Sequence, residues 1–85
     1  MLKLYVRTGC PYSAAVLAKI NDLGVNVLTL NVADPGVADE LIRVGGEKRE
    51  PFFYDDEKDI KMYESDEIVD YLEEQYGKNK NPDAH

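Results

Sequence analysis

The chain has a single cysteine, few basic side chains and no long apolar run, and each shortage excludes a class of protein. One cysteine, Cys10, cannot form an intramolecular disulfide, so the chain lacks the covalent link on which small secreted domains usually depend. Residues 1–9 form a short alternating run that contains Lys3, which predicts neither a signal peptide nor a membrane span. We therefore expect a cytoplasmic protein in reducing surroundings, without membrane contact.

The shortage of basic residues argues against a nucleic-acid partner. Ten Lys and Arg stand against 17 Asp and Glu, which gives a formal net charge of −7, and no basic cluster interrupts this balance. Phosphate backbones are bound by concentrated Lys and Arg, which this chain does not have. An acidic net charge of this kind favours solubility. The 85 residues suffice for one small domain, which we expect to be a monomer.

The first part of the chain has the periodicity of a strand, a helix and a second strand. Residues 2–6 alternate as a strand does, and apolar residues recur at helical spacing between Pro11 and Gly24. Residues 25–32 are rich in β-branched and aliphatic side chains, which predicts a second strand. A strand, a crossover helix and a strand imply a parallel βαβ unit.

The second part predicts a helix, a hairpin and a last helix. Asp34 is a plausible cap for a short helix that ends at Gly45 and Gly46, and two short strands with a polar loop between them follow. The last helix is expected over residues 65–76, Gly77 ends it, and residues 78–85 form a polar tail. The order β-α-β-α-β-β-α predicts an α/β domain over residues 1–77, with a thioredoxin-like fold: a four-stranded mixed sheet with helices on both faces.

Cys10 lies where the first strand becomes a helix. A lone cysteine is most often a small buried apolar residue. Here, however, the thiol precedes a helix that starts at Pro11, and Arg7 stands three residues earlier. The unpaired N–H groups of a helix start and a nearby cation both favour thiolate over thiol. This position predicts a reactive nucleophile at neutral pH, although Arg7 is equally consistent with a solvated charge at a strand end.

The motif Cys10-Pro11-Tyr12-Ser13, within this order of elements, resembles the active site of glutaredoxins, and the likeness covers nearly the whole chain, to Gly77. Glutaredoxins commonly have Cys-Pro-Tyr-Cys, so Ser13 stands where their second cysteine would be. The resemblance implies a monothiol reaction: Cys10 attacks the glutathione sulfur of a mixed disulfide, and a second glutathione regenerates it. Ser13 either donates a hydrogen bond to the thiolate or is simply a favourable residue for the first helical turn.

The resemblance also implies where glutathione binds. Glutaredoxins carry Thr-Val and a cis-proline beside the cysteine, where this chain has Arg49, Glu50 and Pro51. Taken alone, Pro51 is more typical of a proline that opens a strand. Lys48 and Arg49 are both open as partners of the glycine carboxylate. The residues expected to contact glutathione are Arg7, Tyr12, Arg49, Glu50, Pro51, Glu64, Ser65 and Asp66.

The last of these residues stand where two families overlap. Asp66 matches the acidic position of a glutaredoxin Gly-Gly-x-Asp segment, whereas Glu64-Ser65 is similar to the Glu-Ser of the glutathione transferase N-terminal domain. A helix start favours the ligand's carboxylate, and either acid can pair with its ammonium group. The alternative without a ligand is that Ser65 caps the helix and the acids complement its dipole.

The prediction is a glutathione-dependent thiol–disulfide oxidoreductase, with glutathione as co-substrate, glutathionylated proteins or small mixed disulfides as partners, and no metal. One alternative is a stand-alone glutathione transferase N-terminal-like domain, against which 85 residues leave no room for a helical second domain. Another is a carrier of a [2Fe-2S] cluster ligated by glutathione and Cys10 of two chains. Pro11 argues against that carrier, because it stiffens the loop.

Overall fold

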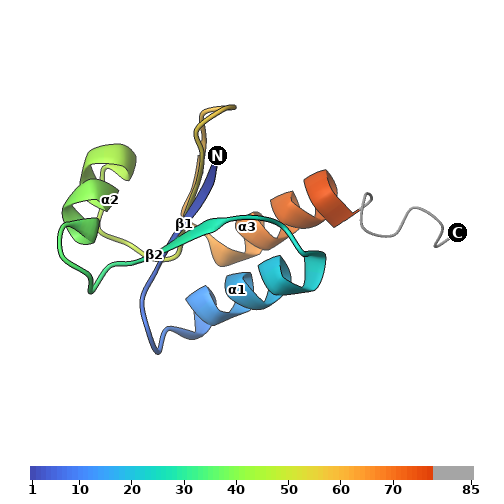
Figure 1. Ribbon diagram of the computed structural model, residues 1–85, viewed down its shortest axis with the longest axis horizontal. Coiled ribbons are helices and arrows are strands. Elements are labelled where there is room, and N and C mark those ends of the chain that lie inside the picture. Colours follow the sequence, from blue (N-terminus) through green and yellow to red (C-terminus); the bar gives the residue numbers. More distant parts are fainter. Residues whose placement is uncertain (78–85) are drawn as a thin grey trace, which may run out of the picture.

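Four strands form one mixed sheet in the computed structural model, which describes residues 1–77 (Figure 1). The sheet order is β2-β1-β3-β4. β1 pairs in parallel with β2 and antiparallel with β3, and β4 pairs antiparallel with β3. The strands are β1 (Leu2–Val6), β2 (Leu28–Asn31), β3 (Phe52–Asp55) and β4 (Ile60–Met62). The expected thioredoxin-like sheet is thereby confirmed.

Helices cover both faces of this sheet. Helices α1 and α3 lie side by side on one face and α2 lies on the other (Figure 1). The helices are α1 (Pro11–Leu23), α2 (Val37–Gly45) and α3 (Ser65–Leu72), which continues as a π-helical turn, η1 (Glu73–Gly77). No helix within residues 1–77 is both long and apolar enough to cross a membrane.

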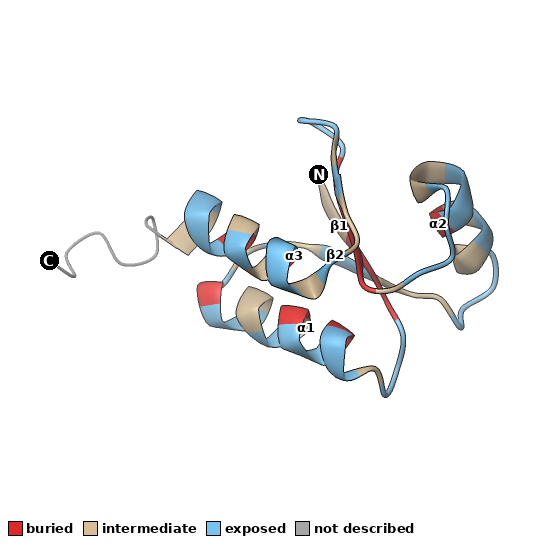
Figure 2. Ribbon diagram, turned by 180° about the vertical axis from the view of Figure 1, so that it is seen from behind, coloured by how far each residue is buried: buried red, intermediate tan, exposed pale blue. Residues whose placement is uncertain are grey.

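The alternation along β1 divides the core into two layers. Leu4 and Val6 face α1 and α3, where they pack with Phe53, whereas Tyr5 faces α2 and packs with Phe52. Buried residues accordingly gather in the sheet and on the helix faces that meet it (Figure 2). β1 is therefore buried on both sides, and the loop that follows it leaves from the centre of the domain.

Two element boundaries in the first half differ from expectation. The second strand is shorter than residues 25–32, because the N–H groups of Gly24 and Val25 both bond to the carbonyl of Ile20 at the end of α1. The cap assigned to Asp34 is wrong. The N-cap of α2 is Gly36, in a left-handed conformation, while the carbonyl of Asp34 accepts the N–H of Val37.

The last helix also differs in detail. Its α-helical part ends at Leu72 rather than at residue 76, and the remaining turn to Gly77 is π-helical. The polar tail predicted for residues 78–85 lies outside the described residues, so the division of the chain into a domain and a tail stays a prediction.

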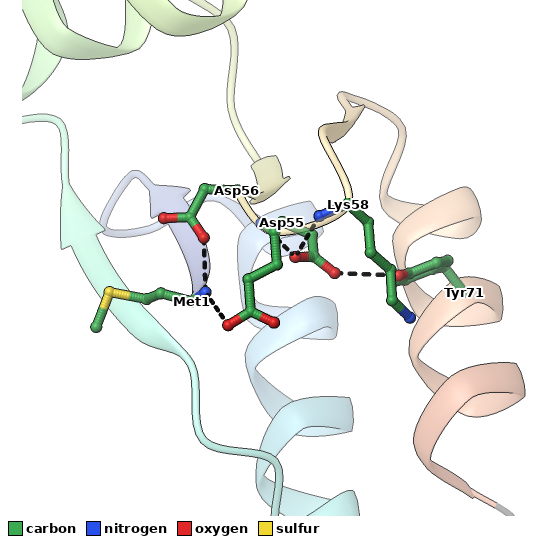
Figure 3. A network of polar contacts seen from close by, with 6 residues as sticks. Met1, Asp55, Asp56, Lys58 and Tyr71 are labelled. Atoms are coloured by element: carbon green, nitrogen blue, oxygen red, sulfur yellow. Dashed lines mark hydrogen bonds and ion pairs between the residues drawn. The ribbon is translucent and has the colours of Figure 1, made fainter.

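A buried carboxylate fixes α3 to the β3–β4 hairpin (Figure 3). Asp55 Oδ1 accepts the backbone N–H groups of Glu57 and Lys58 at 3.1 and 3.3 Å, and Asp55 Oδ2 accepts the hydroxyl of Tyr71 at 3.3 Å. Burial and the Asp55 charge raise the pKa of Tyr71 to about 12, so this hydroxyl remains a donor. The bond holds in place the helix that begins at Ser65.

Candidate active site at the start of α1

Cys10 is the N-cap residue of α1 and is half-buried. Gly9 precedes it with a φ of +85°, a left-handed conformation that glycine adopts without steric cost, and Pro11 opens the helix. The N–H of Cys10 donates to the carbonyl of Arg7, and its carbonyl accepts the N–H of Ala14. This turn places the thiol at the positive end of the helix.

The pKa of the Cys10 thiol is lowered from its ordinary value. The largest cause is the backbone N–H of Ser13, followed by the Ser13 hydroxyl, which outweigh the opposing effect of burial. The N–H of Tyr12 and the charge of Arg7 contribute less. The helix start is therefore more important than Arg7 in favouring the thiolate.

Ser13 supports the thiol from inside the domain. Only 1% of this residue is exposed, and its hydroxyl oxygen accepts the backbone N–H of Arg7 at 3.4 Å. Since the oxygen accepts from Arg7, the hydroxyl proton is available to the neighbouring sulfur. Ser13 thus links the end of β1 to Cys10, a role that goes beyond that of a favourable first-turn residue.

This arrangement predicts how Ser13→Ala changes the pH profile of Cys10. Alkylation of the wild-type thiol by iodoacetamide should persist below the pH range of an ordinary cysteine and be lost as the pH falls through the lowered pKa, because the thiolate is then protonated. Loss of the hydroxyl should raise the pKa of Cys10 and slow alkylation about fivefold near pH 6, since a charge-assisted hydrogen bond is lost. Rates measured across pH check this.

Thr29→Ala is the control, because it removes an exposed hydroxyl from β2, away from the thiol. Its pH profile should match that of the wild type. A Ser13→Ala profile identical to both would contradict the role assigned to the Ser13 hydroxyl.

Three adjoining cavities surround this turn. The thiol cavity, of about 450 Å³, is lined by Cys10 with Arg7, Pro11, Tyr12 and Glu50 among others. The α3 cavity, of about 360 Å³, is lined by Tyr12, Arg49, Glu50, Pro51, Tyr63, Glu64, Ser65 and Asp66. The Lys48 cavity, of about 410 Å³, is lined by Arg7, Val32, Ala33, Lys48 and Glu50. Glu50 lines all three, so the cavities adjoin at this residue, and we refer to the three together as the depression.

The structure brings the expected site residues together around this depression. All of them line the thiol cavity or the α3 cavity except Ser13, which lies buried behind Cys10. The Glu50–Pro51 peptide bond is cis, as expected from the resemblance. The N-cap of α3 is Glu64 rather than Ser65, which is the first helical residue. A larger hollow of about 620 Å³ lies between α1 and α3, but it does not include Cys10, so we place the site at the smaller cavities.

Four of the residues expected to contact glutathione form two ion pairs with one another. Arg49 Nη2 lies 2.5 Å from Glu64 Oε2, and Arg7 Nε lies 3.3 Å from Glu50 Oε1. Arg49 therefore faces α3, whereas Lys48 lines a different cavity together with Arg7 and Glu50. This separation favours Lys48 over Arg49 as the partner of an anion beyond the thiol.

Tyr63 lines the α3 cavity and was not expected from the sequence. Its ring lies 4.9 Å from the Arg49 guanidinium, and its hydroxyl donates to the carbonyl of Glu47 at 3.1 Å. It thereby supports the loop that carries Arg49. The only signal in the sequence is an aromatic residue directly before Glu64 and Ser65. Within residues 1–77 no group of three His, Cys, Asp or Glu side chains is placed to hold a metal ion.

Comparison with known proteins points to one family. Residues 4–80 match the family model described as "Glutathione S-transferase, N-terminal domain". A search of curated proteins finds no significant match.

Solved glutathione S-transferases share the fold. One from the Antarctic clam Laternula elliptica has a TM-score of 0.76 and 24% identity, over 91% of this chain and 36% of that chain. One from Drosophila melanogaster has a TM-score of 0.74 and 26% identity, over 92% of this chain and 36% of that chain. An epsilon-class enzyme from the housefly, Musca domestica, has a TM-score of 0.75 and 23% identity, with the same coverage. The chain thus spans 36% of the length of these structures.

Proposed function

Because the chain belongs to the glutathione S-transferase N-terminal domain family, we propose that it binds glutathione and that Cys10 exchanges thiols with glutathione mixed disulfides. The observation that carries this proposal is the position of a thiol with a lowered pKa at the wall of a cavity that adjoins the start of α3. The thiol supplies the nucleophile, and the helix start supplies the site for the ligand's charged end.

The charges along the depression match the two ends of glutathione. In the α3 cavity, N–H groups at the start of α3 suit the γ-glutamyl carboxylate, while Asp66 and Glu64 suit its ammonium group. In the Lys48 cavity, Lys48 suits the glycine carboxylate, while Arg7 is paired with Glu50. The central cysteine of the tripeptide then lies beside Cys10, between Tyr12 and Glu50.

The reaction proposed for this geometry is a disulfide exchange in two steps. The Cys10 thiolate forms a bond to the glutathione sulfur of a mixed disulfide, the old S–S bond breaks, and the partner leaves as a thiolate that takes a proton from solvent. A second glutathione thiolate then attacks the Cys10 adduct, which yields glutathione disulfide and restores the Cys10 thiolate. Because Ser13 offers no thiol, the second electron pair comes from glutathione in solution.

Asp66→Asn tests the binding site for the γ-glutamyl end. Asp66 is exposed and lines the α3 cavity, so loss of its charge should weaken glutathione binding about tenfold, the effect of one charge-assisted hydrogen bond. Asp70→Asn is the matched control, because Asp70 is an exposed aspartate one turn later on α3 and outside that cavity. Calorimetric titration with glutathione should separate the two variants. Equal affinities would place the ammonium group elsewhere.

Conjugation of glutathione to an electrophile is the second candidate, favoured by the family match. A chloroarene assay distinguishes it from thiol exchange. Release of peptide thiol from a glutathionylated peptide, dependent on Cys10 and exceeding chloroarene turnover, supports thiol exchange. Chloroarene turnover that is undiminished in Cys10→Ser, without peptide release, would support conjugation and overturn the first proposal.

A further inference from the structure

Glu50 is a shielded carboxylate at the junction of the three cavities. Only 6% of its side chain is exposed, whereas the Arg7 side chain that pairs with it is 66% exposed. Burial of a carboxylate is costly unless its charge is compensated, and among residues 1–77 the Arg7 guanidinium forms an ion pair with Glu50. The thiol cavity is therefore lined by a carboxylate and by the guanidinium that this carboxylate engages.

The other buried acid in the domain serves a different purpose. Asp55 is bonded by two backbone N–H groups and the Tyr71 hydroxyl, all of which belong to the hairpin and the helix that it joins. Asp55 lines none of the three cavities, whereas Glu50 lines all of them. These hydrogen bonds give Asp55 a structural role. Glu50, in contrast, lies where a molecule that enters any of the three cavities would meet it.

We propose that Glu50 determines which disulfides Cys10 accepts, by favouring cationic and neutral partners over anionic ones. Arg7 is engaged by Glu50, so the cation nearest the thiol cavity is neutralised before a substrate arrives. The thiolate then repels an anionic leaving group, and among residues 1–77 no free cation in the thiol cavity offsets that repulsion. The substrate class is a mixed disulfide whose non-glutathione half is neutral or basic, such as a glutathionylated cysteine flanked by lysine or arginine. This inference rests on the proposed function only in requiring Cys10 as the nucleophile.

The preference can be measured without glutathione, on symmetric disulfides. The Cys10 thiolate attacks one sulfur, the S–S bond breaks, and the released thiolate takes a proton from solvent. Cystamine is a dication, bis-hydroxyethyl disulfide is neutral and dithiodipropionate is a dianion. Stopped-flow rates at neutral pH and low salt should fall in that order. The ratio of the cystamine rate to the dithiodipropionate rate is independent of the pKa of Cys10 and of the amount of folded protein.

Glu50→Gln should lower that ratio about fivefold, because the carboxylate that engages Arg7 is removed and the Arg7 charge becomes available to anions in the thiol cavity. About 1 M salt should reduce the wild-type preference. Glu74→Gln is the matched control, since Glu74 is an exposed glutamate on η1, outside the three cavities. Its ratio should equal that of the wild type.

A ratio unchanged by Glu50→Gln, or a wild-type preference for the dianion, overturns the inference. No reaction of Cys10 with any of the three disulfides overturns it too, together with the proposed thiol exchange. Absence of glutathione binding alongside a charge preference that depends on Glu50 would overturn the proposed function and leave this inference supported.

Discussion

Cys10→Ala is expected to reduce the release of peptide thiol from a glutathionylated peptide by at least about a thousandfold in kcat/KM. The chain has no second thiol, so no other group can form the covalent intermediate. Cavity residues such as Tyr12 and Asp66 remain, so glutathione binding should survive the substitution. Peptide release measured with excess glutathione, beside a glutathione titration of the same variant, separates loss of chemistry from loss of binding.

Ser13→Cys provides the complementary control for this prediction. Ser13 is buried beside the sulfur of Cys10, so a thiol there should attack the glutathione adduct within the same chain. The adduct should give way to an intramolecular disulfide and free glutathione, visible by mass. Substantial turnover by Cys10→Ala would refute the assignment of the nucleophile.

Asp55→Ala is expected to lower the free energy of unfolding by about 3 kcal/mol. The substitution removes the buried acceptor of two backbone N–H groups and of the Tyr71 hydroxyl. The free energy of unfolding of a small domain is modest, so this loss is a large fraction of it. Urea unfolding measures the change. The same variant should bind glutathione more weakly, since the bond to Tyr71 holds α3, and Ser65 and Asp66 lie at the start of that helix.

Asp56→Ala is the matched control for stability. Its carboxylate pairs with the N-terminal ammonium group of Met1 at the surface (Figure 3), and exposed ion pairs contribute little, about 1 kcal/mol or less. If both variants lost equal stability, the contribution assigned to the buried network would be wrong.

Local patterns predicted most of the fold. The alternation of residues 2–6, the proline at position 11 and the glycines at 24, 45 and 46 mark element ends by backbone chemistry, and the structure has ends at those places. The sequence did not predict element boundaries that depend on distant or competing hydrogen bonds. The N–H of Val25 bonds to the end of α1 and not to a strand, and the α3 helix changes to π-helical geometry after Leu72.

The residues that line the candidate site could be predicted as a set from the sequence, whereas the ion pairs between them could not. Motif resemblance identified the residues around the thiol and at the start of α3 because each follows from a local pattern. The pairing of Arg49 with Glu64, 15 residues apart, and of Arg7 with Glu50 depends on the packing of separate elements, which no local pattern encodes. The same holds for Tyr63, whose contacts with Arg49 and Glu47 come from the fold.

The central claim is that Cys10 accepts glutathione from a mixed disulfide and returns it to a second glutathione. Intact-mass measurement after incubation with a glutathionylated peptide tests this most directly. We predict that the chain gains the mass of one glutathione, that the mass maps to Cys10, and that added glutathione removes it. An unmodified chain, or one that carries the peptide in place of glutathione, would contradict the claim.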